Sequence, residues 1–178
     1  MPSNVPHYAG QSDPLKLGHL ICSRPPPGAT RILHEVRVYT GRPDASKQAR
    51  AYAAHMKQCA AWQRQGAVVI PRILRYPFDW PTSKHQEKGI DVALAIDFVA
   101  LAIDGAYDVG VIASTDSDLR PALEYVYLKF GGRPRAEVMN WRSTTGARRL
   151  SVPGANIWCH WIERQDYDQI QDLTDYTK

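Results

Sequence analysis

The sequence predicts a layered α/β domain whose strands run parallel, and two observations support this prediction. Segments rich in Val and Ile alternate with long helical segments along the chain, which is typical of βαβ units. The segment 109–113 is apolar throughout, as expected for a strand of a parallel sheet that is covered on both faces.

The expected elements follow one another closely enough for a single domain. We expect strands at residues 32–39, 67–74, 108–113, 135–139 and 156–161. We expect helices at residues 15–23, 44–65, 84–103 and 117–130. Residues 163–175, in the acidic tail, are expected to form a solvated helix, and a docking segment is the alternative. Gly66 and Gly131 mark helix ends, because glycine adopts the conformation that stops a helix. The chain therefore divides into an irregular N-terminal segment (1–30), one domain (31–163) and an acidic tail (164–178).

Composition excludes several classes of protein. The chain has 178 residues, 44% of them hydrophobic, and its longest apolar run is too short to span a bilayer, so we expect no membrane association. The three cysteines are Cys22, Cys59 and Cys159. They form no CxxC pair, so neither a zinc knuckle nor a disulfide scaffold is expected, and the default location is the reducing cytoplasm.

The net charge of +4 conceals an uneven distribution of charge. Residues 1–80 contain eleven Lys and Arg against four acidic residues, and such a segment suits a polyanionic partner. Residues 83–118 contain seven acidic residues against Lys84 and Lys88, and an acidic cluster of this kind suits a divalent cation. A solvated surface of mixed charge is the alternative.

The strongest local signal is the junction that follows the apolar strand at residue 113. The strand runs directly into Ser114, Thr115, Asp116, Ser117 and Asp118, which open the next helix. Functional crevices of open α/β sheets lie at the carboxyl ends of strands, and carboxylates there can hold a hard cation. Capping of the helix N-terminus explains the same residues and stays open.

A second signal lies in the apolar helix expected at residues 84–103. At 100° per residue, Lys84, Lys88 and Asp91 would form one polar stripe, so Asp91 is a candidate site residue and Lys88 a neighbouring phosphate contact. An ion pair between Asp91 and Lys84 within the helix is the alternative. Asp97 lies about 120° from Asp91 around the helix and could equally be exposed to solvent or hydrogen-bonded structurally.

Several strings resemble the NYN domain of the PIN-like nuclease superfamily. They are KGIDVALAID at 88–97 and GAYDVGVIASTDSDLRPALEYV at 105–126, supported by RVYTGRP at 37–43, RILRYP at 72–77 and IWCHWIE at 157–163. The last three resemble the bacterial branch of the family, and the similarity covers residues 31–163. It implies a three-layer α/β/α sandwich with a mainly parallel sheet. It also implies a nuclease that depends on Mg²⁺ or Mn²⁺ and usually acts on RNA.

The resemblance assigns roles to individual residues. Asp91 matches the helix acid of the family, and Asp116 and Asp118 match the acids that follow the central strand. These three are the predicted catalytic and metal-binding residues, and Asp97 matches a recurrent acid that we add as a fourth metal ligand. Thr115 stands where the family often has Gly.

The family's first strand, which ends in Asp-Gly-x-Asn, has no counterpart before Ile32. Asp13 lies in a polar stretch before Pro14, and the strand would be central in the family's sheet. Its absence would remove backbone hydrogen bonds on two sides. Three explanations are open: a reading frame that begins upstream of Met1, which we favour; a strand replaced in a homodimer; or a degenerate domain.

The mechanism implied by the resemblance is metal-assisted hydrolysis of phosphodiester bonds in single-stranded RNA. The predicted substrate-binding residues are Lys88, Arg42, Arg72, Arg75, Ser114 and Thr115, and Tyr39, Tyr76 and Trp80 could stack on unpaired bases. Packing is the more favoured role for Trp80. Catalysis is expected if the first strand is supplied. The alternative is a non-catalytic NYN module that binds RNA or a protein partner.

Overall fold

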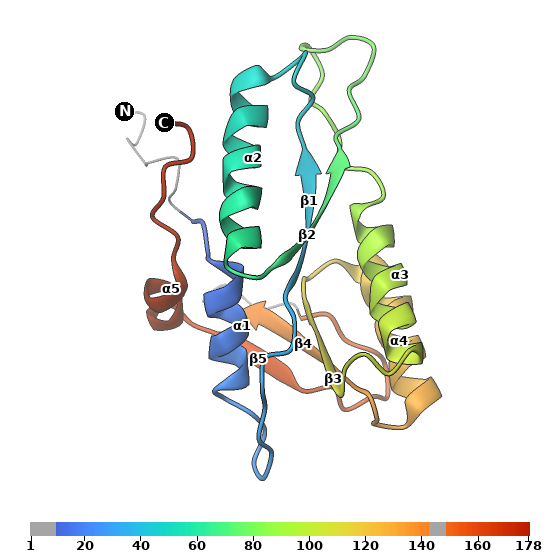
Figure 1. Ribbon diagram of the computed structural model, residues 1–178. Helices are drawn as coiled ribbons and strands as arrows, with labels where there is room; N and C mark the ends of the chain where they lie inside the picture. The colour runs from blue at the N-terminus through green and yellow to red at the C-terminus, as the bar shows by residue number, and fades with distance from the viewer. Residues whose placement is uncertain (1–9, 143–148) are drawn as a thin grey trace. The chain divides into compact units, whose positions relative to one another are not determined.

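The computed structural model describes residues 10–142 and 149–178, which form a mixed α/β structure. The helices are α1 (Pro14–Cys22), α2 (Ala49–Arg64), α3 (Ile90–Ile103), α4 (Arg120–Phe130) and α5 (Arg164–Ile170), with a 3-10 turn, η1 (Ser117–Leu119), before α4. The strands are β1 (Arg37–Arg42), β2 (Val68–Ile73), β3 (Val109–Ala113), β4 (Arg135–Trp141) and β5 (Cys159–Ile162). Figure 1 shows their course along the chain.

The strands form two sheets, and every strand pair within them is parallel, as predicted. β1 pairs with β2, and β3, β4 and β5 follow one another in the second sheet. The described residues contain no strand that joins the two sheets into the single sheet expected from the sequence. The chain also divides into two compact units. One contains the described residues up to Ile90 together with Asp168–Lys178, and the other contains those of Asp91–Tyr167.

The second unit contains a continuous apolar core on one face of its sheet. Ile112 and Val138 are neighbours across β3 and β4, and they pack with the buried Leu123 and Val126 of α4 and Phe98 of α3. The opposite face of the same sheet is also closed, because Glu137 is fully buried and hydrogen-bonds the buried His160 of β5 at 2.8 Å. A strand covered on both faces was expected at residues 109–113, but in β3 only Gly110 and Ile112 are buried and Ala113 is exposed; β4 is the strand that is covered on both faces.

The first unit is built from β1 and β2 with α1 and α2, and most of its predicted boundaries are close to those observed. The first strand begins at Arg37 rather than at Ile32. Gly18 of α1 explains this shift, because a Cβ atom there would lie 2.8 Å from Val36 and 3.1 Å from Leu33. The side chains of Leu33 and Val36 thus pack on α1, and this segment contacts β2 through the Val36 carbonyl, which accepts the Val68 N–H at 2.9 Å.

Two sequence predictions on helices need correction. The helix expected at residues 84–103 begins only at Ile90, because Gly89 has φ +73° and Gln86 is paired with Arg75 in an antiparallel bridge. Lys84 and Lys88 therefore precede the helix, and the polar stripe with Asp91 was wrong. The tail helix, expected at residues 163–175, ends at Ile170.

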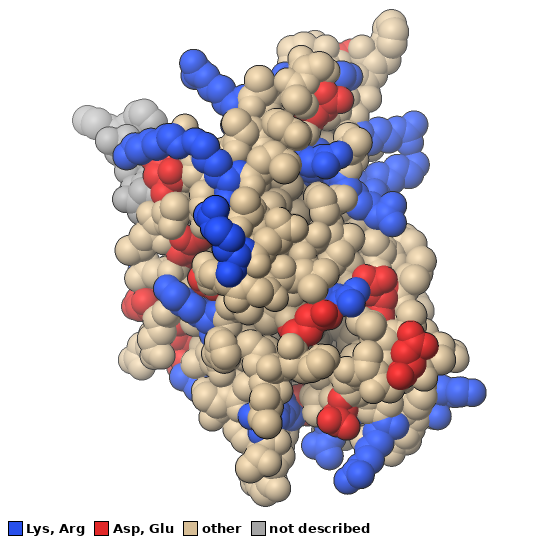
Figure 2. All heavy atoms as spheres, viewed as in Figure 1, with Lys and Arg blue, Asp and Glu red and all other residues tan. Residues whose placement is uncertain are grey.

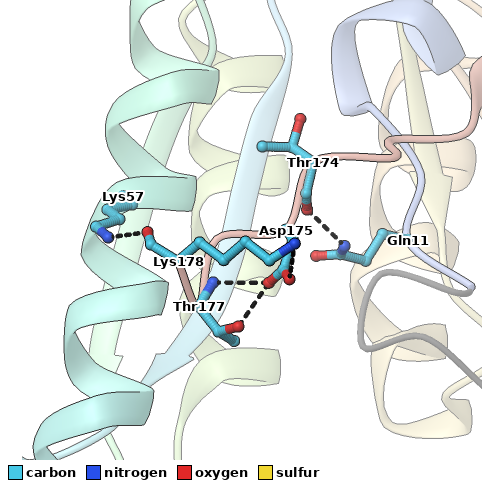
Figure 3. A network of polar contacts seen from close by, with 6 residues as sticks. All are labelled: Gln11, Lys57, Thr174, Asp175, Thr177 and Lys178. Atoms are coloured by element: carbon cyan, nitrogen blue, oxygen red, sulfur yellow. Dashed lines mark hydrogen bonds and ion pairs between the residues drawn. The ribbon is translucent and has the colours of Figure 1, made fainter.

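The last residues of the chain are docked on the first unit. The Asp13 N–H donates to the Ile170 carbonyl at 2.7 Å, and the Asp172 N–H donates to the Gln11 carbonyl at 3.1 Å. Further on, the Gln11 side chain donates to the Thr174 carbonyl, as Figure 3 shows. Asp13 itself is buried and caps α1, accepting the N–H groups of Leu15 and Lys16. The tail is thus bound through polar contacts rather than solvated throughout.

Candidate active site

The candidate site is built on β3, which is fixed by aromatic packing behind it. A Cβ atom on Gly110 would lie 2.6 Å from Phe98 and 2.7 Å from Tyr107, so only glycine allows this close approach. The Tyr107 hydroxyl donates to the Phe98 carbonyl at 2.8 Å, and burial raises the pKa of Tyr107 well above its usual value. These contacts hold β3 against α3 and fix the strand that delivers the acidic residues.

Asp116 follows β3 and has a defined orientation. Its backbone N–H donates to Ser114 Oγ at 3.1 Å, and its carboxylate Oδ1 accepts the N–H of Asp118 at 2.9 Å. Asp116 is therefore the N-cap of η1, so the capping role left open by the sequence is confirmed for this residue. Capping uses one oxygen of one carboxylate, whereas both Asp116 and Asp118 are exposed to solvent. The cap therefore does not account for Asp118.

Asp91 lies in the first turn of α3 and is half-buried. The alternative of an ion pair with Lys84 inside one helix is excluded, because Lys84 lies outside α3. Asp97 lies about 1.7 turns further along α3 and is also half-buried. Ser114 is half-buried and Thr115 is exposed, so both lie at the surface beside Asp116.

The chemistry of the donor set fits a hard cation. Carboxylate oxygens are the ligands that Mg²⁺ takes from proteins, usually one or two of them, with water and substrate phosphate completing the shell. Asp116 and Asp118 can supply two such groups at the exposed end of β3. Within residues 10–142 and 149–178, no group of three or more His, Cys, Asp or Glu side chains could hold a metal ion. A centre assembled from Asp91, Asp116 and Asp118 together therefore stays a prediction.

Asn140 is a polar residue at the same edge that sequence reasoning missed. Ala113 of β3 pairs with Met139 of β4, so Asn140 continues β4 past the position where β3 ends. It is buried, and its side-chain oxygen accepts the N–H of Trp141 at 2.9 Å. The expected strand stopped at Met139, one residue too early. A polar residue after an apolar strand could have identified it.

The predicted substrate-binding cations of the first unit differ in exposure. Arg72, Arg75 and Lys88 are exposed, whereas Arg42 ends β1 and is half-buried. Burial lowers the pKa of His55 on α2, and the charge of Arg42 lowers it further. Of the four, Arg72, Arg75 and Lys88 are therefore the better placed for a ligand in solution.

The aromatic residues proposed for base stacking are engaged to different extents. Tyr39 is half-buried within β1. Tyr76 and Trp80 contact each other edge to face, with ring centroids 4.9 Å apart, which confirms packing as the role of Trp80. Phe78 lies between them in the chain and is fully exposed, but it was not among the residues predicted to stack on bases.

Comparison with known families agrees with this arrangement. The family model of the NYN domain matches residues 3–139, and the chain belongs to this family. The NYN domain is a PIN-like, nuclease-type domain whose members generally depend on a metal ion and act on RNA. No curated protein and no solved structure matches the chain. Among the described residues, no helix has both the length and the apolar character to cross a membrane.

Proposed function

We propose that this protein is a metal-dependent ribonuclease that hydrolyses phosphodiester bonds of single-stranded RNA. One observation carries the proposal: in a chain of the NYN family, two exposed carboxylates follow the carboxyl end of the parallel strand β3. Asp91, Asp116 and Asp118 are the proposed catalytic residues and metal ligands, with Asp97 as a further candidate ligand. Mg²⁺ or Mn²⁺ held there would lower the pKa of a bound water and neutralise charge on the phosphate.

The residues of the chain contribute orientation and substrate contacts. Asp116 is held in one orientation by its bond from the Asp118 N–H, which reduces the cost of ordering it when a ligand binds. Ser114 Oγ accepts the Asp116 N–H, so its own hydroxyl hydrogen is available to donate to a phosphate oxygen. Thr115 lies exposed beside it. Lys88, Arg72, Arg75 and, at the end of β1, Arg42 are the proposed phosphate contacts.

The test is the substitution Asp116→Asn, measured as cleavage of a fluorescent single-stranded RNA in Mg²⁺ and in Mn²⁺. Asn is as good an N-cap as Asp, so the fold around η1 is retained while the charge is lost. Removing a metal ligand costs several kcal/mol of transition-state stabilisation. We therefore expect the cleavage rate to fall by a factor of roughly 100 or more. The matched control is Asp104→Asn, an exposed acid at the end of α3, which should cleave at the wild-type rate.

Equal rates for wild-type protein and Asp116→Asn would remove the catalytic assignment. The second candidate is a non-catalytic NYN module that binds RNA or a protein partner. One observation favours it: among the described residues, no group of three or more His, Cys, Asp or Glu side chains could hold a metal ion. It predicts RNA binding without cleavage in either metal. A homodimer and a cytoplasmic location also stay predictions of the sequence. Sedimentation of the purified protein over a range of concentrations decides the first.

A further inference from the structure

The segment between β2 and α3 (residues 74–89, the β2–α3 loop) has a defined structure of its own. Arg75 and Gln86 exchange backbone hydrogen bonds, each with a donor–acceptor distance of 2.9 Å, and so close the base of the loop. The loop begins directly after Ile73, the last residue of β2. It therefore projects from the carboxyl end of the two-stranded sheet.

An aromatic cluster of Tyr76, Trp80 and His85 holds the loop in place. The ring centroid of His85 lies 5.7 Å from that of Tyr76 and 5.8 Å from that of Trp80. The Tyr76 hydroxyl donates to Gln48 Oε1 at 2.7 Å and accepts the Asp44 N–H at 3.0 Å, which fixes the cluster to the start of α2. A loop that is ordered in this way loses little conformational entropy when it binds a ligand.

Phe78 is the exception within this ordered loop. Its side chain is 109% exposed, although its neighbours Tyr76 and Trp80 pack against each other. A large apolar ring held in water by a fixed backbone gains free energy when it is covered. Aromatic rings presented on an ordered loop are also typical of surfaces that stack on unpaired bases.

The charges around Phe78 select the class of partner. Arg72, Arg75, Lys84 and Lys88 are all exposed within or beside the loop, and Lys47 lies 4.8 Å from the Tyr76 ring centroid. The acids of the loop are Asp79, which accepts a hydrogen bond from Ser83, and Glu87, which lies against Gly41. Figure 2 shows Lys and Arg gathered around the upper part of the drawn face, where Figure 1 places this loop.

We propose that the β2–α3 loop is a binding site for single-stranded RNA, in which Phe78 stacks on an unpaired base and the exposed cations contact the flanking phosphates. This inference rests on the proposed function, since it names the site that would give the nuclease its preference for unpaired RNA. Bases in a duplex are already stacked on their neighbours and offer no free face. The site lies in the unit that does not contain Asp116, so binding and cleavage can be separated by substitution.

The experiment measures fluorescence anisotropy of a labelled single-stranded RNA of about 12 nucleotides, and of the same sequence as a duplex, in EDTA. Phe78→Ala should bind the single strand roughly ten-fold more weakly, because one stacked base is lost, and Phe78→Trp should restore affinity. The matched control is Ile32→Ala, an apolar side chain of the same unit that is 94% exposed, which should bind as wild type. Neither side chain is buried, so both variants should fold.

Three outcomes decide the proposal. Equal affinity of wild-type protein and Phe78→Ala for the single strand overturns it, as does a wild-type protein that binds no RNA in EDTA. An equal loss for the single strand and the duplex also overturns it, because stacking on unpaired bases would then not be the contact. Lys84→Gln should lower the dependence of log affinity on log salt by roughly 0.7, the value for one phosphate of a single strand.

The same measurements separate this inference from the proposed function. Asp116→Asn should bind RNA in EDTA as well as wild type does, since the loop is unchanged. If Asp116→Asn cleaves at the wild-type rate while Phe78→Ala binds weakly, the catalytic assignment fails and the binding site stands. If cleavage depends on Asp116 but Phe78→Ala binds normally, the nuclease stands and the loop is not its RNA site.

Discussion

The two sheets of the molecule are stabilised in different ways. In the three-stranded sheet, five of the seven residues of β4 are buried, whereas none of the six residues of β1 or of β2 is. Parallel strands are normally covered on both faces, and a two-stranded sheet is marginal without such cover. The first unit compensates with polar contacts, at the Tyr76 hydroxyl and along the docked tail. Packing therefore stabilises one region, and directed hydrogen bonds contribute more to the other.

The largest expected effect is the removal of a core side chain from the second unit. Leu123 on α4 is fully buried in the apolar core, so Leu123→Ala should lower the free energy of unfolding by about 3 kcal/mol through lost burial and a cavity. The measurement is urea denaturation followed by circular dichroism. Leu128→Ala is the control, because Leu128 lies on the same helix and is 67% exposed. Equal small losses in both variants would show that packing does not dominate this region.

A smaller effect is expected from the buried polar pair on the other face of that sheet. Glu137→Gln leaves His160 with a neutral partner in a site from which water is excluded, and should cost about 1–3 kcal/mol of unfolding free energy. The double variant with His160→Gln should cost less than the sum of the two single variants, because the residues are in contact. If the losses of the two single variants simply add, the Glu137–His160 hydrogen bond contributes nothing to stability. Hydrogen bonding would then stabilise the first unit but not this face of the three-stranded sheet.

The smallest effect concerns the docked tail, and it depends on pH. Burial raises the pKa of Asp172, but hydrogen bonds from the Thr174 N–H and the Tyr176 hydroxyl, with the charge of Lys16, outweigh it and hold that pKa below its ordinary value. Because the folded pKa is the lower one, ionised Asp172 stabilises the fold above pH about 4, and this contribution is lost as the pH falls through the folded pKa.

The variant Asp172→Asn tests this contribution. It should lower the free energy of unfolding by about 1 kcal/mol at neutral pH, and the difference from wild type should shrink at pH about 3. Chemical denaturation at the two pH values measures it. A difference that is the same at both would show that the tail is bound without the charge of Asp172, and that the polar anchoring of the first unit is overstated.

Much of the fold could be predicted from local sequence. Val and Ile density located β2 and β3 to within a residue or so, and Gly66 and Gly131 follow the ends of α2 and α4 closely. Two of the boundaries that failed were set by contacts between distant residues. Leu33 and Val36 pack against Gly18 of α1, so residues 32–36 are not the strand that their composition favours. Gln86 pairs with Arg75, so residues 84–89 are not the helix that their composition favours.

The site could be predicted only in part, for a related reason. The cluster after β3 was found because an apolar strand that runs directly into Ser, Thr and Asp is a continuous signal in the chain. The placement of Asp91 on a stripe with Lys88 failed because Gly89 adopts φ +73° and starts the helix later. Phe78 was missed because exposure of an aromatic residue depends on which neighbours pack together, here Tyr76 with Trp80.

The sequence by itself determined the class of the domain, its parallel strands, its family and the acidic junction at Asp116 and Asp118, because each is encoded in contiguous residues. The tertiary structure alone decided that the strands form two sheets, that Glu137 pairs with His160, that the tail binds beside α1, and that Phe78 is exposed. These features depend on contacts between residues that are far apart in the chain. The free energy of such contacts cannot be predicted from any single segment of the sequence.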